Sequence, residues 1–126
     1  MNFCFTVDDN IRAFRDVAKN MPESIFAHPY FAMLRHLHER FSLKVQLNMF
    51  YTLGGFSLTE MPDRYKKEFA ENADWLRMSF HSKDETRWPY KEAGYAEVLS
   101  DCLAVQRQIL RFAGEKSLAK TTTVNF

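Results

Sequence analysis

The stretch Phe3-Cys4-Phe5-Thr6-Val7-Asp8-Asp9-Asn10 decides the fold class of this chain. Residues 2–7 are almost continuously apolar, as a β-strand covered on both faces is, and the run stops at two aspartates and an asparagine. Asp9 or Asn10 can cap a following helix, and the next residues have the apolar spacing of one buried helical face. A strand that leads directly into a helix predicts the beginning of a βαβ unit.

Segments of strand length and of helix length continue to alternate along the chain. Further strands are expected over residues 43–51, 75–81 and 121–126, and helices are expected after Pro29, after Pro62 and over residues 95–112, the last with a cap at Gly114. The pattern predicts an α/β fold with about four parallel strands and flanking helices. Its second and third strands alternate apolar with polar residues, so each should have one wetter face.

Composition limits the classes of protein to which the chain can belong. Its 126 residues are 46% hydrophobic, which predicts one domain over residues 1–126. The 17 basic and 16 acidic residues leave a net charge of +1, which argues against nucleic acid or a membrane surface as a partner. No membrane-length apolar run or leader pattern occurs, so a cytoplasmic chain is expected. Cys4 and Cys102 are expected to be packed thiols.

Polar residues follow each of the first three predicted strands, where ligands of parallel sheets bind. Asp8 and Asp9 end the first strand, and Asn48 lies near the end of the second. If the chain turns there, one aspartate can bind a metal while its neighbour acts as a base; the pair is also typical of an ordinary helix N-terminus. His81 and Glu85 end the third strand, and on a helical turn their spacing would suit a divalent metal or a surface pair.

The remaining polar and aromatic candidates are weaker. Trp88 and Tyr90 follow the His81 loop, where their rings can stack on the flat face of a sugar or pack in the core. The three other histidines, His28, His36 and His38, are expected to be surface or edge residues rather than metal ligands.

Two motifs, Phe5-Thr6-Val7-Asp8-Asp9 and Ser79-Phe80-His81-Ser82-Lys83-Asp84-Glu85, resemble the first two motifs of the polysaccharide deacetylase family. The resemblance covers residues 3–82 well, and it implies a partial (β/α) barrel that hydrolyses acyl groups from carbohydrate with the help of a divalent metal. Zinc is the expected metal, and cobalt and manganese are alternatives.

The same resemblance implies roles for individual residues. Asp8 matches the catalytic base, Asp9 and His81 match metal ligands, and Glu85 stands where the family has a second histidine. Ser82 matches the hydroxyl that steadies the metal loop, and we expect substrate contacts from Asn48, Ser82, Trp88 and Tyr90.

The chain departs from the family pattern after the third strand. It has Lys120-Thr121-Thr122-Thr123-Val124 where the family has an Arg-Pro-Pro motif, so the arginine that orients the base is missing, and the later histidine acid would lie beyond residue 126. The fold therefore looks truncated, and the exposed edge of its last strand predicts a homo-oligomer or a missing C-terminal segment.

Two other functions compete with a deacetylase. A catalytically inactive deacetylase-like domain would bind carbohydrate or support a partner domain, and the departures from the family pattern favour it. A receiver-type signalling module would have the same length and acidic pair, but its third strand ends in aspartate, whereas this one ends in His81.

Overall fold

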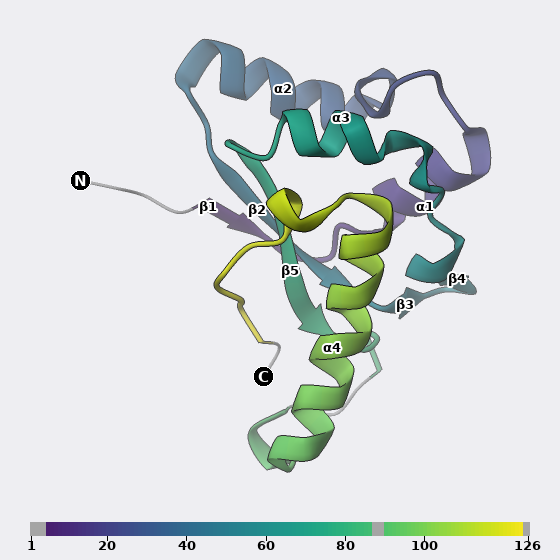
Figure 1. Ribbon diagram of the computed structural model, residues 1–126, viewed down its shortest axis with the longest axis vertical. Coiled ribbons are helices and arrows are strands. Elements are labelled where there is room, and N and C mark those ends of the chain that lie inside the picture. Colours follow the sequence, from purple (N-terminus) through teal and green to yellow (C-terminus); the bar gives the residue numbers. More distant parts are fainter. Residues whose placement is uncertain (1–4, 87–89, 125–126) are drawn as a thin grey trace.

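A parallel sheet lies at the centre of the computed structural model, which describes residues 5–86 and 90–124. Its three strands are β1 (Phe5–Val7), β2 (Val45–Phe50) and β5 (Leu76–Ser82), in the order β1-β2-β5 (Figure 1). The helices are α1 (Ile11–Asn20), α2 (Pro29–Phe41), α3 (Lys66–Glu71) and α4 (Tyr95–Phe112), and a short hairpin joins β3 (Thr52–Leu53) to β4 (Phe56–Ser57). The predicted α/β class and parallel sheet are confirmed.

Four buried phenylalanines join the helices into one layer. Each helix contributes one ring, and the ring centroids of neighbouring pairs lie between 5.2 and 6.3 Å apart. The four residues are Phe14, Phe31, Phe69 and Phe112. Because β2 and β5 are each added on the same side of the strand before, right-handed crossovers carry α1, α2 and α3 to one face of the sheet. The contacts of Phe112 with Phe14 and Phe69 place α4 with them. The other face of the sheet carries the polar side chains of β2 and β5.

The polar face of β2 is buried, contrary to the expectation of a wetter face. All six residues of the strand are buried, including Gln46 and Asn48. Gln46 donates to the Asn48 Oδ1 and Ser79 Oγ atoms, at 3.0 and 3.1 Å, and accepts from the Thr121 hydroxyl at 3.2 Å. The alternation correctly predicts two faces, but these polar groups bond to one another rather than to water.

The strand expected over residues 121–126 is absent from the described part of that segment. Residues 121–124 have no regular secondary structure, and the one bridge nearby pairs Leu118 with Met78. Thr121 and Thr122 bond to β2 and β5 through their hydroxyls, on Gln46 Oε1 and the Phe80 carbonyl, instead of through a backbone ladder. The sheet therefore has three strands among the described residues rather than about four, and a deacetylase-type barrel is not established.

Three positions on the predicted apolar faces of the helices lie outside the core. Phe41 at the end of α2 is 66% exposed, and Tyr95 and Leu99 in the first turns of α4 are 81% and 39% exposed. Phe41 and Tyr95 are the terminal residues of their helices. None of the helices described within residues 5–86 and 90–124 has the length and apolar character needed to cross a membrane.

Asn10 ties the start of α1 to the sheet and to α2. It occupies the predicted cap position, but its side chain makes no capping bond. Its Nδ2 donates instead to the carbonyls of Val7 and Asn48, at 2.5 and 3.2 Å, and its Oδ1 accepts from the Tyr30 hydroxyl. The residues that follow β1 are thereby held against β2.

Burial raises the pKa of Tyr30 from 10 to about 12, so the free energy of unfolding depends on pH in the alkaline range. The folded state favours the neutral hydroxyl, so the stability that Tyr30 adds is complete below pH 10 and is lost as the pH rises towards 12. We expect Tyr30→Phe to weaken this fall in the free energy of unfolding, measured by urea titration at several pH values. Tyr95→Phe is the control, because Tyr95 is exposed; equal pH dependence in wild type and Tyr30→Phe would contradict the prediction.

Candidate functional site

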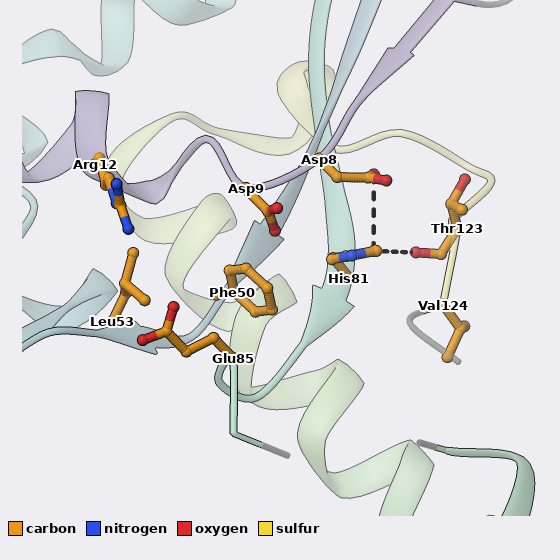
Figure 2. A pocket seen from close by; sticks show the side chains of 9 residues that line it. All are labelled: Asp8, Asp9, Arg12, Phe50, Leu53, His81, Glu85, Thr123 and Val124. Carbon is orange, nitrogen blue, oxygen red and sulfur yellow. Dashed lines mark hydrogen bonds and ion pairs between the residues drawn. The ribbon is translucent and has the colours of Figure 1, made fainter. Parts of the chain in front are cut away.

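A cavity of about 730 Å³ opens at the carboxyl ends of the parallel strands (Figure 2). Its wall combines side chains that follow β1, β2 and β5 with the C-terminal segment. The lining residues are Asp8, Asp9, Arg12, Phe50, Leu53, His81, Glu85, Thr123 and Val124. The volume lies within the range of about 300–1,000 Å³ that is usual for small-molecule sites. Three carboxylates face one guanidinium and one imidazole, which makes the cavity polar and acidic.

The chain turns sharply between the two aspartates. Asp9 has a φ of 60°, in the left-handed region that few residues other than glycine adopt and that aspartate tolerates better than most. This turn ends β1 and leads into α1, so Asp8 and Asp9 both line the cavity instead of pointing to opposite faces of a continuing strand. The turn therefore places both aspartates in the wall of one cavity.

Asp8 is held at one oxygen and open at the other. Its Oδ1 accepts a hydrogen bond of 2.7 Å from Asn48 Nδ2 and lies 3.8 Å from His81 Nδ1. Its side chain is 47% exposed, and Oδ2 has no hydrogen bond or ion pair with any residue in the described part of the chain. A carboxylate oxygen in this state can accept a proton from a water molecule or a ligand in the cavity.

His81 is fixed by the C-terminal segment. The residue is 6% exposed, its Nδ1 lies 2.7 Å from the Thr123 carbonyl oxygen, and its ring meets Phe50 edge to face at 5.4 Å between centroids (Figure 2). A carbonyl oxygen only accepts hydrogen bonds, so Nδ1 carries the hydrogen of this bond. In the neutral ring Nε2 is then the acceptor nitrogen.

The predicted metal ligands share the cavity but do not form a ligand set. Asp9, His81 and Glu85 all line it, yet no three histidine, cysteine, aspartate or glutamate side chains within residues 5–86 and 90–124 are close enough together to hold a metal ion. The helical turn expected to bring His81 and Glu85 together does not exist, because His81 belongs to β5 and Glu85 to the turn after it. A metal at this position stays a prediction.

The residues expected to contact a substrate are placed elsewhere. Asn48 and Ser82 are fully buried and Tyr90 nearly so, and none of the three lines the cavity. The Tyr90 hydroxyl donates to Asp101 at 2.8 Å and accepts from the Lys83 amide at 3.1 Å, and burial raises the pKa of Tyr90. Trp88, the fourth of these predictions, lies outside the described residues.

Two of the remaining histidines have structural partners. His28 Nδ1 accepts from the Tyr30 amide at the start of α2, and His38 stacks on Trp75 with 4.5 Å between ring centroids. His36 is exposed on α2. None of the three lines the cavity, in line with their expected places outside the site.

Arg12, Phe50 and Thr123 line the cavity without having been expected there. Arg12 follows Asp9 by three residues and lies in the first turn of α1. Its place just after the end of a strand could therefore have predicted that it lines the site. Phe50 lies on the polar side of the alternation in β2. Thr123 reaches the site because the C-terminal segment runs alongside β5, with Leu118 next to Met78 and Thr122 bonded to the Phe80 carbonyl, and no local pattern indicates these contacts.

Comparisons with models of protein families, with curated proteins and with solved structures find no match to this chain.

Proposed function

We propose that the cavity binds an acylated carbohydrate and hydrolyses its acyl group, as the polysaccharide deacetylases do. The observation that carries the proposal is Asp8, whose carboxylate is fixed by Asn48 at Oδ1 and open at Oδ2 in a cavity of ligand size. The motif residues Asp9 and His81 line the same cavity, which supports the resemblance. The test is release of acetate from chitin oligomers and acetylated xylan, with zinc or cobalt added.

Asp8 acts as the general base of the proposed reaction. Its Oδ2 takes a proton from a water molecule while the water oxygen bonds to the acyl carbon. The carbon–nitrogen or carbon–oxygen bond to the sugar then breaks, and the proton returns from Asp8 to the leaving group. Asn48 keeps Asp8 Oδ1 in place through a hydrogen bond of 2.7 Å from Nδ2, and His81 Nδ1 lies 3.8 Å from the same oxygen.

Binding of a divalent metal by Asp9, His81 and Glu85 can be tested apart from turnover. We expect the wild type to take up zinc, cobalt or manganese, and the double variant Asp9→Ala, His81→Ala to lose that uptake because two ligands are gone. Calorimetric titration measures both, with His36→Ala as the control on an exposed histidine. Equally weak uptake by wild type and double variant would show that these residues hold no metal.

A second function is binding of carbohydrate without turnover. The observation that favours it is the spacing of Asp9, His81 and Glu85, which do not form a metal-ligand set among the described residues. An inactive deacetylase-like domain would bind chitin or xylan oligomers and release no acetate. Measuring binding and acetate release on the same samples separates the two functions.

A further inference from the structure

A buried group of polar side chains lies directly beneath Asp8. Asn48 is 0% exposed, and Ser79 and Gln46 beside it are also buried. The group bonds to itself, to the C-terminal segment through Thr121, and to Asp8 through Asn48. Buried amides of this kind are costly unless every polar atom has a partner, so their arrangement is tightly constrained.

The orientation of the Asn48 amide is set by its neighbours. Its Oδ1 accepts from Ser79 Oγ at 2.6 Å and from Gln46 Nε2 at 3.0 Å. Its Nδ2 therefore faces Asp8 and donates to Oδ1 at 2.7 Å. Turning the amide over would set its oxygen against the Asp8 carboxylate and its NH₂ against the NH₂ of Gln46, which would lose the bonds to both residues.

Only the donor side of Asn48 reaches the site. Asn48 does not line the cavity and is fully buried, so a substrate in the cavity meets Asp8 instead. In contrast to the buried Asn48, the side chain of Asp8 is 47% exposed, so the bond at Oδ1 is needed to limit its rotation. A fixed Oδ1 keeps Oδ2 at one position in the cavity.

We propose that Asn48 is a positioning residue for Asp8: its Nδ2 holds the carboxylate so that Oδ2 can accept the proton of the attacking water. This inference rests on the proposed hydrolytic function. Precise placement of a catalytic group lowers the barrier because no ordering is needed during the reaction, and a misplacement of about 1 Å can cost about 10²-fold in rate. Asn48 was expected to contact substrate, and its burial assigns it this different role.

The test replaces the donor of Asn48 with an acceptor of the same shape. Asn48→Asp keeps the acceptor towards Ser79 and Gln46 but sets a second carboxylate against Asp8. The new carboxylate cannot donate to Asp8 and repels it, so Asp8 loses the bond that fixes its position. We expect kcat for acetate release to fall about 10–100-fold, with little change in KM.

Ser79→Ala is the matched control. It removes the bond from Ser79 Oγ to Asn48 Oδ1. The bond from Gln46 Nε2 to the same oxygen and the bond from Asn48 Nδ2 to Asp8 stay in place. We expect both variants to lower the melting temperature, but only Asn48→Asp to lower kcat by about tenfold or more at nearly constant KM. An unchanged kcat in Asn48→Asp, or an equal fall in Ser79→Ala, would overturn the positioning role.

Nitrogen-15 NMR of the Asn48 side-chain amide tests the bond without turnover. At one fixed pH, we expect the NH₂ protons of Asn48 to exchange with water more slowly in the wild type than in Asp8→Ala, which lacks the acceptor. If the wild type releases no acetate, the proposed hydrolysis fails, and the exchange rates still decide whether Asn48 holds Asp8. Equal exchange rates in the two proteins would overturn the inference on their own.

Discussion

We expect replacement of Asp8 with asparagine to lower the rate of acetate release by about 10²–10⁴-fold, the usual contribution of a general base. The amide has nearly the same shape as the carboxylate and can still accept from Asn48, but it cannot take a proton from water. The loss should therefore appear in kcat, with the fold and the binding of carbohydrate retained. Steady-state assays on chitin oligomers with zinc or cobalt, together with circular dichroism, measure both.

His36→Ala is the control for this substitution. His36 is exposed on α2 and does not line the cavity, so its loss should leave acetate release within about twofold of wild type. Turnover that Asp8→Asn leaves intact would remove Asp8 from the mechanism. A comparable loss of acetate release in His36→Ala would show that the rate responds to any damage to the folded protein rather than to a change in the site.

We expect replacement of Phe14 with alanine to lower the free energy of unfolding by about 3–5 kcal/mol. Phe14 is fully buried, and its ring contacts Phe31 at 5.2 Å, Phe112 at 5.8 Å and Phe69 at 6.0 Å between centroids. The substitution leaves a cavity where all four helices meet. Urea unfolding followed by circular dichroism gives the difference from wild type.

Phe41→Ala is the matched control, because the same side chain is removed from a position that is 66% exposed. We expect a change within about 0.5 kcal/mol there. If Phe14→Ala cost no more than Phe41→Ala, the helices would not share the common aromatic core described above.

Local periodicity predicts the elements that position the site. The apolar run before Asp8 gives β1, the alternation over residues 43–51 contains β2, and residues 75–81 overlap β5. Pro29 and Gly114 mark the start of α2 and the end of α4, where Gly114 has a φ of 88° and its amide bonds to the Ile109 carbonyl. These signals act over a few residues, so they can be read without knowledge of the tertiary fold.

Contacts between distant residues account for what the sequence does not predict. Thr123 lies 42 positions from His81, and nothing in either local pattern indicates the bond between them. The β-branched run around Thr122 favours a strand, but its hydroxyls find acceptors on β2 and β5 and the backbone ladder is lost. The alternation of polar residues in β2 indicates a face near water, but Asn48 on that face is buried. Its amide can be buried because it donates to Asp8 and accepts from Ser79.

The candidate site is predicted in part for the same reason. Parallel strands bring Asp8, Asp9 and His81 to one rim, and the structure places them in one cavity. Their exact spacing depends on the turn at Asp9 and on the loop that carries Glu85, which strand order alone does not define.

Isotope incorporation tests most directly whether this cavity hydrolyses an acyl group with Asp8 as the base. Wild type and Asp8→Asn are incubated with chitin oligomers or acetylated xylan and zinc or cobalt in ¹⁸O-labelled water, and the released acetate is analysed by mass spectrometry. The account predicts one labelled oxygen in each acetate released by the wild type, and at least about 10²-fold less acetate from Asp8→Asn. Unlabelled acetate, equal release by both proteins, or no release by the wild type would contradict it.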